Sequence, residues 1–200
     1  MVISNSMHYL QTENSRLREA NARMAERLHR LQHALRALNH LLDLLPEITP
    51  ESDALAVVYR LLETTLQAIG SENGSLLLLD EEKNELVFAA VAGPYAEPLQ
   101  GYRIPADEGV VGWCITNRQP RLVADVRLDP YFSPAVDRYT TFQTQSLIAI
   151  PLVKEERIYG ALEVVNTTSG EPFTEEDEDI VRLVAYLTTE VLARAEQAMA

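Results

Sequence analysis

A heptad repeat of leucines runs through the first 45 residues, and it limits the possible folds more than any other feature of this chain. Apolar residues recur at alternating intervals of three and four positions, which is the a/d pattern of a coiled coil. Pro46 follows the last leucine and should end the helix. The sequence therefore predicts a coiled-coil helix over residues 1–45 and a separate domain over residues 46–200. The predicted dimer seam consists of Leu10, Asn14, Leu17, Asn21, Met24, Leu28, Leu31, Leu35, Leu38 and Leu42.

Two polar residues within the repeat favour a parallel homodimer. Asn14 and Asn21 stand at a positions, where a buried amide pairs with the same residue of an in-register partner. Glu13 at a g position would face Arg18 of the partner helix at the following e position. The alternative is a single amphipathic helix that packs on the domain. The arginines are scattered among glutamates, so the repeat does not have the basic block of a DNA-binding zipper.

Charge and composition exclude several classes of partner. The 200 residues carry a net charge of −13, and 46% of them are hydrophobic, which is typical of a globular protein. Six Arg against three Glu and one Asp give residues 1–45 a charge of +2, so subtraction from −13 leaves −15 for the remainder. Such an acidic domain should repel nucleic acid and anionic membranes. No stretch is long and apolar enough for a membrane span, and the single cysteine favours a cytoplasmic protein.

The remaining sequence alternates helical and strand patterns. Apolar spacing predicts a helix over 53–69 that residues 71–74 break, and strands at 75–79 and 86–91 joined by an acidic turn. A short strand near 102–104, a short helix over 108–117 and a helix capped by Ser133 with Pro134 at its first position should follow. A second hairpin over 146–153 and 157–165 leads to a long helix over 176–200. These elements indicate an α+β fold with a central antiparallel sheet flanked by terminal helices.

The distribution of reactive side chains argues against catalysis. All four histidines precede Pro46, so the domain has no imidazole for a Ser-His-Asp arrangement, a zinc site or a haem ligand. Cys114 is the only cysteine. The carboxylates lie in turns or at helix starts, where no neighbouring group suggests a role in acid–base chemistry. We therefore expect no enzymatic activity, no metal and no haem.

Several sequence blocks resemble a known sensory domain. They read Gly109-Val-Val-Gly112-Trp113-Cys114, Asp125-Val-Arg-Leu-Asp129-Pro130-Tyr-Phe132, Thr144-Gln145-Ser146, Ile158-Tyr-Gly160-Ala-Leu-Glu-Val-Val-Asn166 and Phe173-Thr-Glu-Glu-Asp177-Glu178. In this order and spacing they resemble a GAF domain, a regulatory module of phosphodiesterases, cyclases and bacterial signalling proteins, over about residues 46–198. The resemblance implies terminal helices on one face of the sheet and a ligand pocket on the other.

The last block is similar to a motif of GAF domains that bind cyclic nucleotides. That motif has an Asn-Lys pair, a gap, then Phe, three residues, Asp and Glu. Asn166, Phe173, Asp177 and Glu178 match it, whereas Thr167 occupies the lysine position and removes a salt-bridge partner for Asp177. The other interpretation is structural, because Thr174 and Asp177 also form a capping-box pattern at the start of the last helix.

The resemblance also suggests which residues meet a ligand. The segment between the two hairpins covers the pocket in this family, and its aromatic rings could stack on a planar ligand while Arg103 or Arg138 offsets a phosphate or carboxylate. Alternatively these rings only pack the cover. Bilin-binding cysteines of this family usually have a histidine beside them, and Cys114 has none. We therefore expect no bilin and expect Cys114 to be buried as a small hydrophobic residue. The candidate ligand residues are Tyr95, Tyr102, Arg103, Trp113, Cys114, Phe132, Tyr139 and Phe142.

Together these features predict a cytoplasmic, non-catalytic sensory module that binds a small molecule and signals through a coiled-coil homodimer. A cyclic nucleotide stays open as the ligand, and a signalling output protein is an expected partner. The alternative is a ligand-free GAF scaffold for dimerisation or protein docking.

Overall fold

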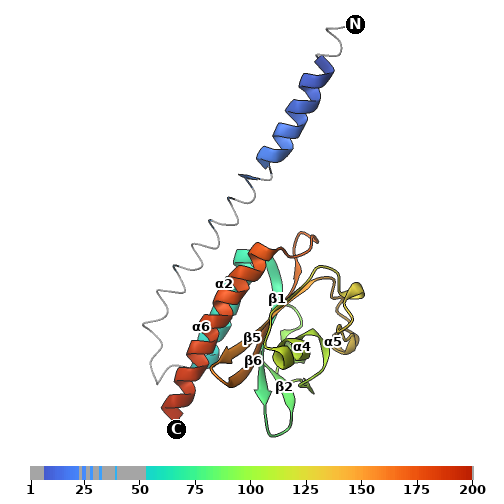
Figure 1. Cartoon of the computed structure of the whole chain (residues 1–200). Helices are drawn as coiled ribbons and strands as arrows, with labels where there is room; N and C mark the ends of the chain where they lie inside the picture. The colour runs from blue at the N-terminus through green and yellow to red at the C-terminus, as the bar shows by residue number, and fades with distance from the viewer. Residues whose placement is uncertain are drawn as a thin grey trace.

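The computed structural model describes residues 7–22, 24–25, 28, 32, 39 and 53–199. Residues 7–22 form a helix, which Figure 1 shows standing clear of the domain. The side chains of Leu10 and Leu17 on this helix are exposed in the single chain, as are those of Asn14 and Asn21. Pairing of two such helices stays a prediction. Leu31, Leu35, Leu38, Leu42 and the predicted stop at Pro46 lie outside the described residues.

The domain is a six-stranded sheet in the order β3-β2-β1-β6-β5-β4, and each neighbouring pair of strands is antiparallel. This confirms the predicted α+β class. The elements in chain order are α2 (Ala54–Ile69), β1 (Ser71–Asp80), β2 (Glu85–Ala92), α3 (Ala96–Leu99), β3 (Arg103–Pro105), α4 (Gly109–Asn117), β4 (Arg121–Val123), η2 (Val126–Leu128), α5 (Ala135–Thr140), β5 (Leu147–Lys154), β6 (Arg157–Thr167) and α6 (Glu175–Met199).

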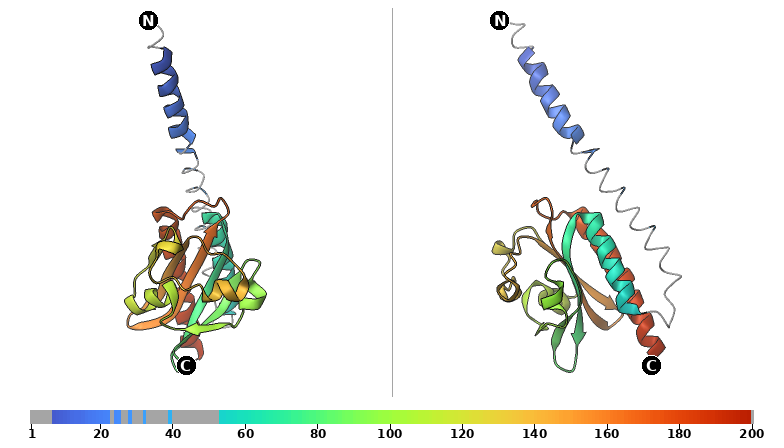
Figure 2. Two further views of the ribbon diagram at one scale, coloured as in Figure 1. Left: turned by 90° about the vertical axis from the view of Figure 1, so that its right-hand side faces the viewer. Right: turned by 180° about the vertical axis from the view of Figure 1, so that it is seen from behind.

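The two long helices, α2 and α6, lie side by side on one face of the sheet, and the short elements α3, α4 and α5 lie over the other (Figures 1 and 2). Strand alternation divides the sheet's side chains between the two faces. On β6, Leu162 and Val164 pack under the long helices, and Ala161 and Val165 point the other way. We call these the helix face and the lid face.

The helix face has clear local causes. Asp53 caps α2 by accepting a hydrogen bond from the Leu55 amide at 3.0 Å, and Gly70 ends the helix in the left-handed conformation with φ of 66°. The predicted capping box also forms. The Thr174 hydroxyl accepts from the Asp177 amide at 3.3 Å, and the Asp177 carboxylate accepts from the Thr174 amide at 2.9 Å.

The helix α2 does end before the predicted break at residues 71–74, but the first strand starts earlier than expected, because β1 begins at Ser71 and includes these residues. Gly74 pairs with Ala92 on one side and Val164 on the other. A Cβ at Gly74 would lie only 3.0 Å from side-chain carbons of Leu62 and Leu66. The glycine that suggested a chain break instead lets the strand approach α2 closely.

Candidate ligand cavity

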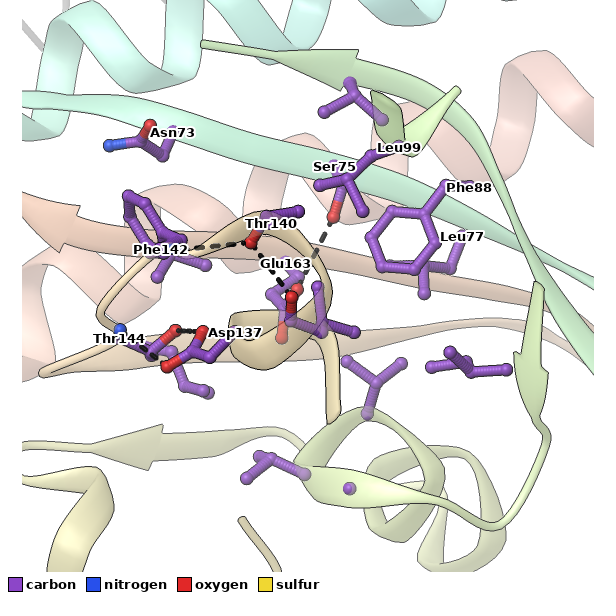
Figure 3. A pocket seen from close by; sticks show the side chains of 18 of the residues that line it. Asn73, Ser75, Leu77, Phe88, Leu99, Asp137, Thr140, Phe142, Thr144 and Glu163 are labelled. Carbon is purple, nitrogen blue, oxygen red and sulfur yellow. Dashed lines mark hydrogen bonds between the residues drawn. The ribbon is translucent and has the colours of Figure 1, made fainter. Parts of the chain in front are cut away.

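A cavity of about 110 Å³ lies on the lid face, between the sheet and the short helices (Figure 3). A buried water needs roughly 10–15 Å³ on this kind of measure, so the cavity has room for several waters or a small organic molecule. Most of its lining is apolar, with a few polar groups among them, as is usual for small-molecule sites. The lining residues used below are Asn73, Ser75, Phe88, Tyr95, Leu99, Glu108, Val110, Phe132, Ser133, Val136, Asp137, Thr140, Phe142, Thr144, Glu163 and Val165.

The helix α4 forms one wall of this cavity. Gly109 has a φ of 74°, a conformation that glycine adopts without strain, and it turns the chain into the helix. Val110 then points into the buried lid-face cluster. A Cβ at Gly112 would collide with the backbone of Asp107, so the helix can start this close to the preceding turn only with glycine there. The Gly-Val-Val-Gly block thus shapes a wall.

Two hydrogen-bonded clasps hold α5 over the cavity. The Ser133 hydroxyl donates to the Glu108 carboxylate at 2.5 Å. The Asp137 carboxylate accepts from the Thr144 amide at 2.9 Å and from its hydroxyl at 2.6 Å. The helix starts one residue later than predicted, because Pro134 is the N-cap residue, but the Ser133 hydroxyl still accepts from the Ala135 amide at 3.4 Å. We use the word lid for the segment 133–146 that these clasps hold.

Asn166 fixes the far end of the lid. Its Oδ1 accepts from the amides of Gln145 at 2.7 Å and Ser146 at 3.2 Å, and its Nδ2 donates to the Gln143 carbonyl at 2.8 Å. Its φ of 54° is one that asparagine tolerates better than most residues. The other motif residues lie away from the cavity, because Phe173 is buried on the helix face, Asp177 caps α6 and Glu178 pairs with Arg182.

Glu163 lies at the centre of the cavity-facing sheet. It is on β6, between strands β1 and β5, and its side chain points toward Ser75, which is its partner in register on β1 (Figure 3). The Ser75 hydroxyl donates to it at 3.4 Å. Glu163 is half-buried, and the loss of water around its carboxyl raises the pKa of that group to about 7; the nearby Asp137 adds to this increase while the Ser75 hydrogen bond opposes it.

Within the part of the chain that the structure describes, no Lys, Arg or His lines the cavity, whereas Glu108, Asp137 and Glu163 all do. Arg103, one of the candidate ligand residues, instead pairs with Asp80 and Glu85, each at 2.8 Å, at the outer end of β2. Arg138 is also absent from the lining. The cavity is therefore acidic.

The candidate aromatic residues fall into two groups. Tyr95, Phe132 and Phe142 line the cavity, and the rings of Tyr95 and Phe142 meet edge to face at 5.2 Å. Tyr102 and Tyr139 do not line it, but they stack on each other with ring centroids 4.4 Å apart. This contact joins the residue before β3 to α5.

Trp113 and Cys114 also lie away from the cavity lining. Trp113 carries the Arg121 guanidinium 4.5 Å above its ring. Cys114 is buried and donates to the Ala149 carbonyl at 3.4 Å, and burial raises the pKa of its thiol to about 12. A thiol held in its neutral form is a poor nucleophile, so Cys114 acts as a core residue.

Sequence reasoning missed Glu163 and Ser75. The available clue was a single carboxylate in the middle of an apolar run, Ala161-Leu-Glu163-Val-Val165, within a predicted strand. Among the described residues, no cluster of three or more His, Cys, Asp or Glu could hold a metal ion. A search of the same residues found no helix long and apolar enough to cross a membrane.

The sequence profile of the GAF domain matches residues 53–191. The chain belongs to the GAF domain family. This places it among the regulatory and sensory modules found in signalling proteins, and it agrees with the two-faced sheet and the cavity beneath a lid.

Curated relatives include two vertebrate phosphodiesterases. The dual cyclic-AMP and cyclic-GMP phosphodiesterase 11A of Takifugu rubripes is 25% identical over 152 residues, which is 71% of this chain and 17% of that protein. The cone cGMP-specific phosphodiesterase subunit alpha' of Mus musculus is 32% identical over 76 residues, 38% of this chain and 9% of that protein. The chain thus corresponds to a small part of each enzyme.

Solved structures with the same fold come from different kinds of protein. The GAF domain of a phosphoenolpyruvate-protein phosphotransferase from Coxiella burnetii superposes with a TM-score of 0.69 at 19% identity, covering 82% of this chain and 96% of that one. The free methionine-R-sulfoxide reductase of Neisseria meningitidis, solved in complex with its substrate, has a TM-score of 0.67 at 23% identity over 82% of this chain and 93% of that one. At these identities the likeness concerns the fold alone.

Proposed function

We propose that this chain is a non-catalytic, cytoplasmic sensory module that binds a small molecule in the lid-face cavity and signals through a parallel homodimer of its N-terminal helix. The observation that carries the proposal is the cavity itself. It is a space of about 110 Å³ with a largely apolar wall, bordered by a short lid that side-chain hydrogen bonds hold in place. A GAF domain serving only as a scaffold would have no need of that space.

The lid supplies the response to binding. One clasp joins the start of the lid to the turn before α4, the other ties α5 to Thr144 within the lid, and Asn166 joins the end of the lid to β6. Strands β5 and β6 in turn carry α6 on their other face. A ligand that binds better when the lid is closed would shift the population toward that state and change how α6 packs. An output protein docked on the terminal helices would sense this change.

The exposed heptad residues support the dimer. Leu10 is 62% exposed and Leu17 54% exposed in the single chain. Exposure of these apolar side chains to water is unfavourable unless a partner covers them. In this proposal residues 1–45 form a rod that dimerises, and residues 46–200 form the domain that senses the ligand. The alternative function is a ligand-free scaffold that uses the same rod.

A thermal-shift screen with cyclic AMP, cyclic GMP and small metabolites tests the binding proposal. The names of the phosphodiesterase relatives justify including both cyclic nucleotides. A ligand at about 100 times its dissociation constant should add about 2.7 kcal/mol to the free energy of unfolding. The Val136→Phe variant, which fills the cavity from the lid, should lose this response, whereas Val136→Ala should keep it. Stabilisation that survives Val136→Phe would place the ligand elsewhere and contradict the proposal.

Light scattering tests the dimer. The unaltered chain should have the mass of two copies, and replacing both Asn14 and Asn21 with Leu should stabilise the rod while allowing larger assemblies. A monomer at micromolar concentration would end the coiled-coil proposal and leave the sensory cavity untouched.

A further inference from the structure

The carboxylates of the cavity differ in how many hydrogen bonds they accept and how short these bonds are. The Glu108 carboxylate is engaged by Ser133, and both oxygens of Asp137 are engaged by Thr144. Within the described residues Glu163 has only the Ser75 hydroxyl, at 3.4 Å, which is the long end of the range for such a bond. An ionised carboxylate can accept about four hydrogen bonds. Glu163 is therefore the cavity carboxylate without a short hydrogen bond, and it keeps most of its accepting capacity.

The surroundings of Glu163 lack any compensating charge. The cavity lining from β1, β2, β5 and α4 contributes no titratable side chain, while Asp137 faces Glu163 from α5 and Glu108 stands before α4. Buried carboxylates are normally matched by a cation or by several donors. Here neither is supplied by the described residues, so the missing partner is one that a ligand could bring.

We propose that the cavity selects small organic cations, in which a compact apolar body fills the space beside Phe88 and Val110 and an ammonium or amidinium group pairs with Glu163. This inference rests on the proposed function, since it names the ligand class of the same cavity. An anionic group such as a cyclic phosphate would meet three carboxylates and no cation there. An engineered apolar cavity of about 150 Å³ holds benzene, so a body of about four carbon atoms suits the space of about 110 Å³ here.

Binding should depend on pH in a defined direction. The cation pairs with the ionised form of Glu163, whose pKa in the empty cavity is about 7. The ionised fraction then rises from about one tenth at pH 6 to about nine tenths at pH 8. An alkylammonium group, with a pKa near ~10.4 as in lysine, stays charged throughout. The observed affinity for the cation should therefore increase about tenfold between pH 6 and pH 8.

Three probes that share an isobutyl group and differ in the charge of their polar group test which charge the cavity prefers. Isobutylamine carries a cation, isobutanol a neutral hydroxyl and isovalerate an anion. Titrations of the full chain, followed by calorimetry or protein NMR, should show that isobutylamine binds most tightly and isovalerate least. The Glu163→Gln variant keeps the shape of the side chain and removes its charge, so it should weaken isobutylamine by at least about tenfold and remove the pH dependence. Glu82→Gln, an equal charge change in the exposed β1–β2 turn, should alter neither.

Three results would overturn the inference. They are a failure of isobutylamine to bind, binding of isovalerate or isobutanol at least as tight as that of the amine, and an affinity for isobutylamine that falls as the pH rises. If isobutanol or isovalerate binds at least as tightly as the amine and Val136→Phe abolishes that binding, the sensory cavity stands and only its preference for cations is refuted. Loss of the cavity function itself would instead appear as stabilisation by a ligand that Val136→Phe does not affect.

Discussion

The two faces of the sheet are built in opposite ways. On the helix face, two long helices cover aliphatic side chains, and Leu62, Leu162 and Val181 have no exposed surface. On the lid face, elements of four to nine residues cover the same sheet, and a cavity remains beneath them. The helix face is held by packing, which tolerates no void. The lid face also has a buried apolar cluster, which includes Leu77 and Leu86, but the lid over its cavity is tied down by side-chain hydrogen bonds at a few points, which can be broken and remade.

This contrast predicts that the two faces contribute differently to stability and to opening of the domain. Dense aliphatic packing sets the free energy of folding, because each buried leucine contributes on the order of 2–3 kcal/mol by leaving water. A lid joined to the rest by clasps such as Ser133–Glu108 and Thr144–Asp137 can open at lower cost than the whole domain unfolds. The following predictions test the contrast, beginning with the largest expected effect.

Leucine truncations on the two faces should differ in cost. Leu62→Ala removes a fully buried side chain from the helix face and should lower the free energy of unfolding by about 3–4 kcal/mol. Leu99→Ala, on the four-residue helix α3 that already borders the cavity, should cost less than about 2 kcal/mol because that segment can relax. Urea unfolding measures both. Equal costs would mean that the two faces are packed alike.

Comparison with the Glu163→Gln variant should show that ionisation of Glu163 destabilises the unaltered protein as the pH rises. The folded-state pKa of Glu163 is about 7, above the ordinary glutamate value of 4.5, so folding favours the protonated form. The unaltered protein therefore loses stability relative to Glu163→Gln between about pH 4.5 and pH 7, by up to about 3 kcal/mol. Melting temperatures of the two proteins should be close at pH 5 and separate at pH 8, with the variant higher. A gap of the same size at both pH values would show that Glu163 is not shielded from solvent.

Release of the lid should cost less than damage to the helix face. Asn166→Ala removes three hydrogen bonds to residues 143–146 and places alanine at a φ of 54°, so we expect a loss of about 2 kcal/mol. Limited proteolysis should then cut within the lid first. Asn166→Asp, which keeps both accepting interactions, is the matched control and should be cut more slowly than Asn166→Ala. If neither variant changes the rate of cleavage within the lid, Asn166 does not anchor it.

The smallest effect should come from the capping box of α6. Thr174→Ala removes the hydroxyl that caps the helix and should cost about 1 kcal/mol. Since this cap lies on the helix face, ligand binding in the cavity should be unchanged, as titration of the variant would show. Reduced affinity would mean that the two faces are coupled more tightly than their packing suggests.

The sequence predicted most of the regular structure and less of the site. Apolar spacing located α2, α6 and both hairpins, because their side chains must alternate between a core and solvent or between two buried faces. The break of the helix before Gly74 was predicted correctly, but the start of β1 at Ser71 was not, since a glycine can mark either a loop or a close approach within a strand, and only the position of α2 decides between them. Thr174 and Asp177 were correctly predicted to cap, because a capping box is local in sequence.

The cavity depended on contacts that no local pattern contains. Glu163 meets Ser75 across 88 positions of sequence and lies near Asp137 on a different element. Tyr95, Phe132 and Phe142 were recognised as candidates by residue type, but the same criterion also selected Trp113, which packs with Arg121 away from the lining. Which rings face a cavity is fixed by how short helices dock, and this is a tertiary property.

Crystals pressurised with xenon test the contrast between the faces most directly, because xenon enters apolar cavities and leaves packed interiors empty. We predict a xenon site on the lid face, among Phe88, Val110 and Val136, and none between the long helices and the sheet. Absence of xenon from the lid face, or an equally occupied site beneath α2 and α6, would contradict the account.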